Sequence, residues 1–190
     1  MPQDTQTQAP NQNQATGQRG QQKQGGRRPK PKSRYGTQMA EKQQLKEIYG
    51  ISEGQLRNYY KEARRVRSAT GDYLVRLLEQ RLDNAVFRAG FAVTRPTSRQ
   101  MVSHGFFQVN GRGTNVASYQ LKPGDIVTIK PTKRGKSHFS NFPKSLQNAT
   151  LPSWLSLDHE QFSFKVSGMP SAEEAMTGAD IQAIVEFFAR

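Results

Sequence analysis

Six side chains between Thr94 and Lys130 could bind an anion from fixed positions on a folded protein. They are Arg95, Arg99, His104, Arg112, Lys122 and Lys130. Arginine and lysine donate hydrogen bonds to phosphate oxygens and neutralise their charge, so a fixed array of such side chains suits the crowded phosphates of a folded nucleic acid. The chemistry predicted for this stretch is therefore electrostatic binding of a polyanion, without a catalytic step.

The charge of the whole chain favours the same class of partner. The 190 residues include 28 Lys and Arg against 15 Asp and Glu, for a formal net charge of +13. The excess is concentrated in residues 1–34 and 79–142, whereas residues 143–190 have more acidic than basic side chains. A field of this size attracts polyanions, and nucleic acid is the leading candidate.

Residue types argue against several other kinds of site. The absence of cysteine excludes disulfides, thiolate zinc sites and cysteine nucleophiles. The histidines His104, His138 and His159 share no ligand spacing with a carboxylate, so we expect no metal and no cofactor. No acid and base pair or nucleophile elbow is recognisable, which predicts that the protein is not an enzyme. There is also no apolar run long enough for a transmembrane helix and no apolar segment of a secretory signal.

A short helix must position the first of the cations. Thr94 can cap this helix, and Pro96 suits its first turn because the missing N–H costs nothing there. Arg95 and Arg99 are then one turn apart and lie on one face. His104 follows near the helix end, where it either packs as a cap or hydrogen-bonds a phosphate or a 2′-hydroxyl.

A hairpin should follow the helix. Gly105 is expected to end the helix, and the segment 106–109 then leads as a strand into Asn110-Gly111, the strongest short hairpin signal. A second strand is expected over 126–129. This scaffold would present Arg112, Lys122 and Lys130.

Helical periodicity dominates from Thr37 to Gly90. A first helix should end at Gly50, and a second should open with a capping box formed by Ser52 and Gln55. The leucine pattern predicts one further helix from about Thr70 to Gly90. The second helix also has a run of cations that leans toward phosphate contact: Lys61, Arg64, Arg65 and Arg67.

The two ends of the chain differ in character. Residues 1–34 are rich in Gln, Gly and Pro and should be disordered when free, because they cannot bury enough apolar surface. Phe164 and Val166 alternate as a strand, and residues 181–188 form an amphipathic helix that needs a partner. The N-terminal segment ends in a basic arm, which is either a solubilising tail or a segment that orders on RNA: Arg27, Arg28, Lys30, Lys32 and Arg34.

Collinear motifs from about residue 25 to 190 resemble the bacterial-type small-subunit ribosomal protein four family. The motifs are Tyr35-Gly36, Ile48-Tyr49-Gly50, Tyr59-Tyr60-Lys61-Glu62-Ala63, Leu82-Asp83-Asn84, Gly90-Phe91, Thr94-Arg95, Arg99-Gln100, Val102-Ser103-His104-Gly105, Val109-Asn110-Gly111 and Ala117-Ser118-Tyr119.

The resemblance implies an α+β fold in two parts behind a disordered tail at 1–34. A helical domain would span 35–80 and be completed by 145–190. An inserted RNA-binding module, 81–144, would place two helices on a short, mainly antiparallel sheet. The Gln-rich tail stands where the family usually has a folded, sometimes zinc-binding segment, so no zinc is implied.

The resemblance also implies a function. The protein would be a structural constituent of the small ribosomal subunit that binds its ribosomal RNA directly and nucleates assembly. Other expected partners are small-subunit ribosomal protein five and messenger RNA near the channel where it enters, with an influence on accuracy. By position, Arg95, Arg99, Ser103 and His104 would lie on the RNA face, and the basic arm beside that channel. The expected location is the cytoplasmic ribosome, with an organellar ribosome as the other possibility.

Two alternatives remain at this stage. The chain could be a standalone RNA-binding factor associated with ribosomes, although its helical and C-terminal motifs would then have no explanation. It could also be an accessory module of an RNA-modifying enzyme. That would need a separate catalytic domain with a positioned Asp, for which no segment is long enough.

Overall fold

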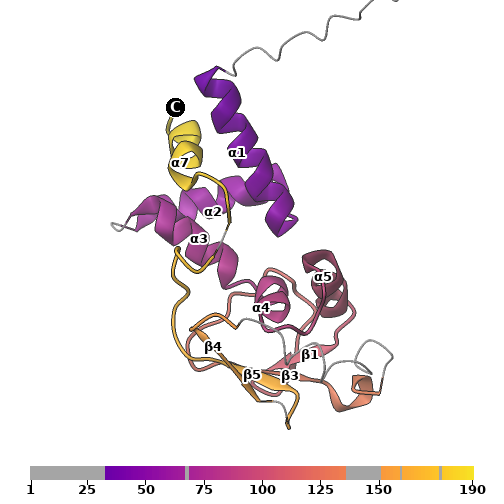
Figure 1. The fold of residues 1–190 in the computed structure, drawn as a ribbon. Helices are drawn as coiled ribbons and strands as arrows, with labels where there is room; N and C mark the ends of the chain where they lie inside the picture. The colour runs from indigo at the N-terminus through magenta and orange to yellow at the C-terminus, as the bar shows by residue number, and fades with distance from the viewer. Residues whose placement is uncertain (1–32, 67–68, 136–150, 159, 176) are drawn as a thin grey trace, which may run out of the picture. The chain divides into compact units, whose positions relative to one another are not determined.

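The computed structural model describes residues 33–66, 69–135, 151–158, 160–175 and 177–190. Its N-terminal part consists of α1 (Arg34–Tyr49), α2 (Glu53–Arg65) and α3 (Thr70–Glu79), as Figure 1 shows. The predicted left-handed stop at Gly50 is confirmed by its φ of 59°. The capping box is also confirmed, since Ser52 accepts from the Gln55 backbone and its own N–H donates to the Gln55 side chain.

The predicted single helix from Thr70 to Gly90 is wrong. It is broken after α3, and a separate helix, α4, runs over Leu82–Arg88. The break occurs because Arg81 is extended and pairs with Gln120 in a β-bridge, while the N–H of Leu82 donates to the Tyr119 carbonyl at 2.9 Å. Periodicity along the helix carries no signal for a bridge to a segment 39 residues away.

The elements predicted around the cations are confirmed. α5 spans Arg95–Ser103 with Thr94 as its N-cap, and Gly105 follows it with a φ of 66°. Strands β1 (Phe107–Val109) and β2 (Arg112–Gly113) are joined at Asn110 and Gly111, whose φ values are 50° and 78°. Two positive φ values are what a tight hairpin turn requires, and Asn and Gly tolerate them best.

The sheet includes residues far beyond this hairpin. Its order is β2-β1-β3-β5-β4 with antiparallel pairing throughout, and the later strands are β3 (Ile126–Ile129), β4 (Leu155–Asp158) and β5 (Ser163–Val166). A 3₁₀ turn, η1 (Pro131–Lys133), follows β3. The resemblance implies that 145–190 completes the helical domain. Within that segment, β5 pairs with β3, and its alternating Phe164 and Val166 are buried in the core under the sheet.

Two apolar clusters organise the described chain. In the first, α4 and α5 cover one face of the sheet, with Phe91 packed edge-on against Phe107 at 6.0 Å between ring centroids. The second lies among α1, α2, α3 and the last helix, α7 (Ile181–Ala189). Figure 1 shows α7 beside α1, and the ring of Phe188 stacks on Tyr60 at 5.0 Å. The C-terminal helix thus has the N-terminal partner that its apolar face predicts.

Candidate nucleic-acid interface

Three of the predicted contact residues line one hollow at the end of α5. Ser103 and His104 come from the C-terminus of the helix, and Lys130 from the residue after β3. The hollow has a volume of about 400 Å³ and is open to solvent. Its lining also includes Gly105, Gly113, Thr114 and Asn115. The structure therefore brings together side chains that are up to 27 residues apart in sequence.

Two glycines leave room for the Lys130 ammonium group. A Cβ at Gly113 would be 2.9 Å from Lys130 Nζ, and one at Gly105 would be 3.5 Å away. The backbone of Lys130 is fixed by a 2.8 Å hydrogen bond to the Phe106 carbonyl. The ammonium is thus seated against backbone while still reaching the hollow, which suits a phosphate oxygen as its partner.

The other groups in the hollow can recognise a nucleotide. The Ser103 hydroxyl donates to the Arg99 carbonyl at 2.9 Å, which leaves its oxygen free to accept from a 2′-hydroxyl. His104 is the C-cap of α5 and its side chain is exposed. The sequence reasoning missed Thr114 and Asn115, although their place directly after a hairpin turn beside Arg112 could have indicated them.

Arg112 and Lys122 are exposed but lie differently with respect to the hollow. Arg112 is next to Gly113 on β2, at the rim. Lys122 precedes β3, whereas Lys130 follows it, so the strand separates the two lysines. The turn of Lys122 is closed by its N–H donating to Asp125 at 2.8 Å. The structure does not bring Lys122 into the hollow.

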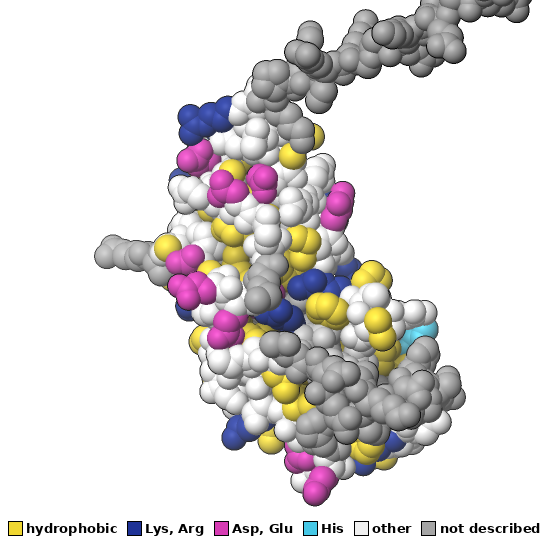
Figure 2. Space-filling model, viewed as in Figure 1, with side chains coloured by type: hydrophobic (Ala, Val, Ile, Leu, Met, Phe, Trp, Pro, Cys, Tyr) yellow, Lys and Arg dark blue, Asp and Glu magenta, His cyan; other side chains and the backbone are white. Residues whose placement is uncertain are grey.

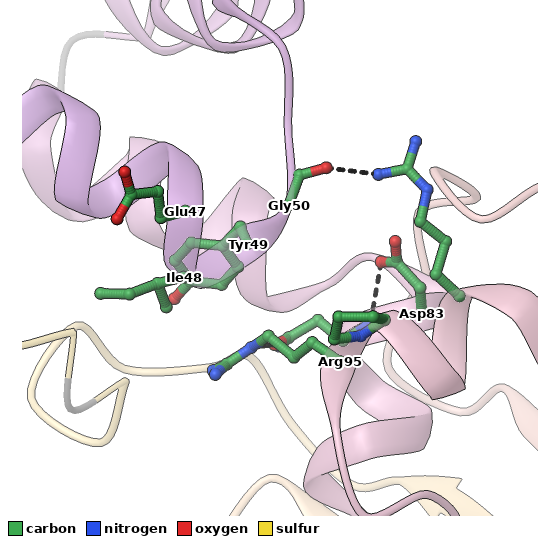
Figure 3. Close-up of a pocket in the computed structure, with 9 residues that line it drawn as sticks. Glu47, Ile48, Tyr49, Gly50, Asp83 and Arg95 are labelled. Carbon is green, nitrogen blue, oxygen red and sulfur yellow. Dashed lines mark hydrogen bonds between the residues drawn. The ribbon is translucent and has the colours of Figure 1, made fainter.

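Arg95 and Arg99 point from α5 to the end of α1. Nη1 of Arg99 donates to the carbonyl of Gly50 at 2.5 Å, the dashed line at the top of Figure 3. The Arg95 guanidinium lies over the rings of Tyr49 at 5.1 Å and Phe87 at 4.5 Å, and its Nε donates to Asn84 at 2.9 Å. Both predicted contact residues are therefore already engaged within the protein.

These two arginines line a cavity of about 150 Å³ between α1 and the start of α5. Burial removes water from the Arg95 guanidinium and is the main reason that its pKa is below the ordinary arginine value. Tyr49, on the same cavity, donates its hydroxyl to the fully buried Glu79 at 2.6 Å. Burial first, and then the charge of Glu79, raise the pKa of Tyr49 above its ordinary range.

A second basic surface lies on α2. Lys61, Arg64 and Arg65 are exposed there, whereas Arg67 lies outside the described residues. The sequence reasoning missed Arg57, which is also exposed and one turn before Lys61, a spacing that could have indicated it.

Of the predicted basic arm, the structure describes Arg34. Arg27, Arg28, Lys30 and Lys32 lie outside the described residues, as does most of the predicted tail at 1–34. Arg34 is the first residue of α1, and its Nη2 pairs with Glu186 at 2.8 Å.

Acidic side chains are scattered over one face of the helical part. In the view of Figure 2, Asp and Glu side chains are spread over the region where Figure 1 places α1, α3 and α7, with few cations among them.

Within the described chain, no three His, Asp or Glu side chains are close enough to hold a metal ion. No helix in that part of the protein is long and apolar enough to cross a membrane.

Comparison with known proteins gives two family matches that together cover most of the chain. Residues 4–79 match the ribosomal protein S4/S9 N-terminal domain, and residues 80–127 match the S4 domain. The boundary between the matches falls at the break between α3 and α4. The second match contains α4, α5 and the hairpin, and therefore much of the hollow.

Individual relatives agree with these matches. Small ribosomal subunit protein uS4 of Akkermansia muciniphila is 45% identical over 161 residues, which cover 85% of this chain and 79% of the relative. The protein of the same name from Chlorobium phaeovibrioides is 43% identical over 176 residues, covering 93% and 84%. That of Chloroflexus aurantiacus is 43% identical over 160 residues, covering 83% and 78%. This chain therefore belongs to the small ribosomal subunit protein uS4 family.

Proposed function

We propose that this protein binds small-subunit ribosomal RNA as a structural, non-enzymatic part of the small ribosomal subunit. The observation that supports this most directly is the hollow where Ser103, His104 and Lys130 converge. It offers a cation, an exposed imidazole and a hydroxyl within one open site. RNA presents complementary groups as phosphates and 2′-hydroxyls.

The contact surface extends beyond the hollow. Arg112 lies at its rim, and the exposed cations of α2 give a second patch: Arg57, Lys61, Arg64 and Arg65. Each phosphate contact releases condensed counterions, so the binding constant should fall with salt. For Z contacts, the slope of log K against log salt is about −0.7Z to −0.9Z.

Further partners are proposed from family membership. They are small-subunit ribosomal protein five and messenger RNA near the channel where it enters, with the basic arm up to Arg34 as the messenger contact. A role in nucleating assembly and in decoding accuracy belongs to the same proposal. The role in assembly would follow from the two basic surfaces, because phosphate contacts on both of them would stabilise a folded RNA junction around the protein.

The test is filter binding of an in vitro transcript of small-subunit ribosomal RNA to the full chain over a range of salt. Changing His104→Gln together with Lys130→Gln should weaken binding several-fold and make the salt slope shallower. Lys165→Gln is the matched control, since Lys165 is exposed on β5 between the buried Phe164 and Val166 and so faces away from α4 and α5. A wild-type slope near zero, or equal losses in the control, would overturn the proposal.

A further inference from the structure

Arg95 and Arg99 of α5 point away from the hollow and toward α1. That helix lies in the region that matches the ribosomal protein S4/S9 N-terminal domain. Arg99 donates to the carbonyl of Gly50, the C-cap residue of α1, and Arg95 lies over Tyr49, the last residue of that helix. A cation at a helix C-terminus meets unpaired carbonyls and the negative end of the helix dipole. Both contacts therefore favour the arrangement in which α5 meets the end of α1.

The polar groups around Arg95 are themselves held in place. The side chain of Asn84, which accepts from Arg95, donates to the Glu79 carbonyl at 3.2 Å. Because Asn84 is buried, water does not compete for these hydrogen bonds. Glu79 accepts from Tyr49 and from Arg88 Nε at 3.1 Å. Arg95 thus joins a buried network that includes residues of α1, α3 and α4, and its guanidinium has a fixed orientation.

The two proposed RNA surfaces belong to different parts of the fold. The cations of α2 belong to the helical part, whereas the hollow is built by α5 and the sheet. An RNA that contacts both surfaces gains affinity if they are already in the correct relative position, because the ordering cost is then met in the free protein. The residues that fix the junction would control binding without touching the RNA.

We propose that Arg95 and Arg99 are positioning residues, which clamp α5 to the end of α1 and set the distance between the α2 cations and the hollow. This inference rests on the proposed function. It replaces the direct RNA contact that the sequence predicted for the two side chains with a positioning role. As direct contacts, they would contribute to the salt slope. As a clamp, they contribute to affinity but leave the number of phosphate contacts unchanged.

The first test measures the clamp without RNA. The chain has no cysteine, so Asn58→Cys on α2 and Ser156→Cys on β4 would give two unique, exposed sites for spin labels. In the Arg95→Gln, Arg99→Gln double variant, the distance distribution between the labels should broaden. It should stay narrow in Arg112→Gln, which loses one exposed arginine. An unchanged distribution in the double variant would overturn the clamp.

The second test uses the same ribosomal RNA transcript. The double variant should bind about tenfold more weakly, a size expected when a preorganised site becomes flexible, with its salt slope retained. Arg112→Gln should instead make the slope shallower by about 0.7–0.9. A slope that becomes shallower in the double variant as well, by about 1.4–1.8 if both phosphate contacts are lost, would identify Arg95 and Arg99 as direct contacts and overturn the proposal.

A conservative variant separates the clamp from a general loss of folding. Arg99→Lys keeps a cationic donor at this position and should retain the narrow distribution and the affinity of the wild type. If the double variant shows no cooperative unfolding, both tests are made with Arg99→Gln alone, which removes one hydrogen bond to the backbone carbonyl of Gly50. If the wild type fails to bind the transcript, the proposed function fails, while the label distances still decide on the clamp.

Discussion

Arg81 and Asp83 form a doubly hydrogen-bonded ion pair at the break between α3 and α4. Arg81 Nη2 lies 2.6 Å from Asp83 Oδ2, and Nε lies 3.0 Å from Oδ1. The two side chains are only 1% and 6% exposed. Arg81 also donates to the Tyr59 hydroxyl at 2.9 Å, so the pair links α2 to the first residues of α4. The interruption of the helix is thus fixed by a buried, fully paired charge.

Removing the acid from this pair should destabilise the protein strongly. Asp83→Ala leaves the Arg81 guanidinium buried without its carboxylate, for an expected loss of about 3–5 kcal/mol in the free energy of unfolding. Urea denaturation followed by circular dichroism measures this loss. Glu160→Ala, which removes an exposed acid, is the control and should change stability by less than about 0.5 kcal/mol. Similar losses in the two variants would contradict the assigned role.

The buried hydroxyl of Tyr49 should make stability depend on alkaline pH. Its pKa in the folded protein is raised above the ordinary 10.0, mainly by burial, so above that pH the unfolded chain loses a proton that the folded chain keeps. Stability from this group is therefore complete below pH 10 and falls as pH rises, by up to about 1.4 kcal/mol per pH unit.

The variant Tyr49→Phe isolates this effect. At neutral pH it should lose about 1.5–3 kcal/mol, because the hydrogen bond to the charged Glu79 is removed. Above pH 10 the wild type should lose its advantage over the variant, as measured by urea denaturation of both proteins at several pH values. A difference that stays constant with pH would show that Tyr49 ionises equally in both states.

Adding one methyl group should disturb the hollow. Gly113→Ala places a Cβ 2.9 Å from Lys130 Nζ, and the flexible end of the lysine side chain must move away. We expect RNA affinity to fall several-fold and stability to change by less than about 0.5 kcal/mol, measured by filter binding and thermal unfolding. Gly135→Ala is the control, since a Cβ there meets nothing within 4 Å. Unchanged affinity in Gly113→Ala would argue against Lys130 as a phosphate contact.

Glu53 should contribute a small stability that disappears in acid. Partial burial works to raise its pKa, but hydrogen bonds from Lys42 and Lys46 outweigh this and lower the pKa from 4.5. The contribution is therefore present above pH 4.5 and is lost as pH falls below it. Because the side chain is 37% exposed, Glu53→Gln should cost less than about 1 kcal/mol at neutral pH. Denaturation at pH 7 and pH 3 tests this, with the two proteins converging at the lower pH.

Local signals in the sequence predicted a large part of the fold and some of the site. The stop at Gly50, the Ser52 capping box, the Thr94 cap and the Asn110-Gly111 turn all depend on residues within a few positions of one another. The motifs also identified the family. For the site, Ser103, His104 and Lys130 were predicted as RNA contacts, and the structure places the three side chains around one hollow.

The sequence by itself thus determined the local elements, the basic character and the family, because caps, turns and charge are properties of neighbouring residues. Only the tertiary structure decided that the helix breaks at Arg81, that β5 joins the sheet and that Arg95 and Arg99 reach α1. Each of these depends on a pairing between distant segments. Their physical basis is burial against distant partners, of Phe164 and Val166 under the sheet and of the charges in a paired network, and local periodicity does not specify those partners.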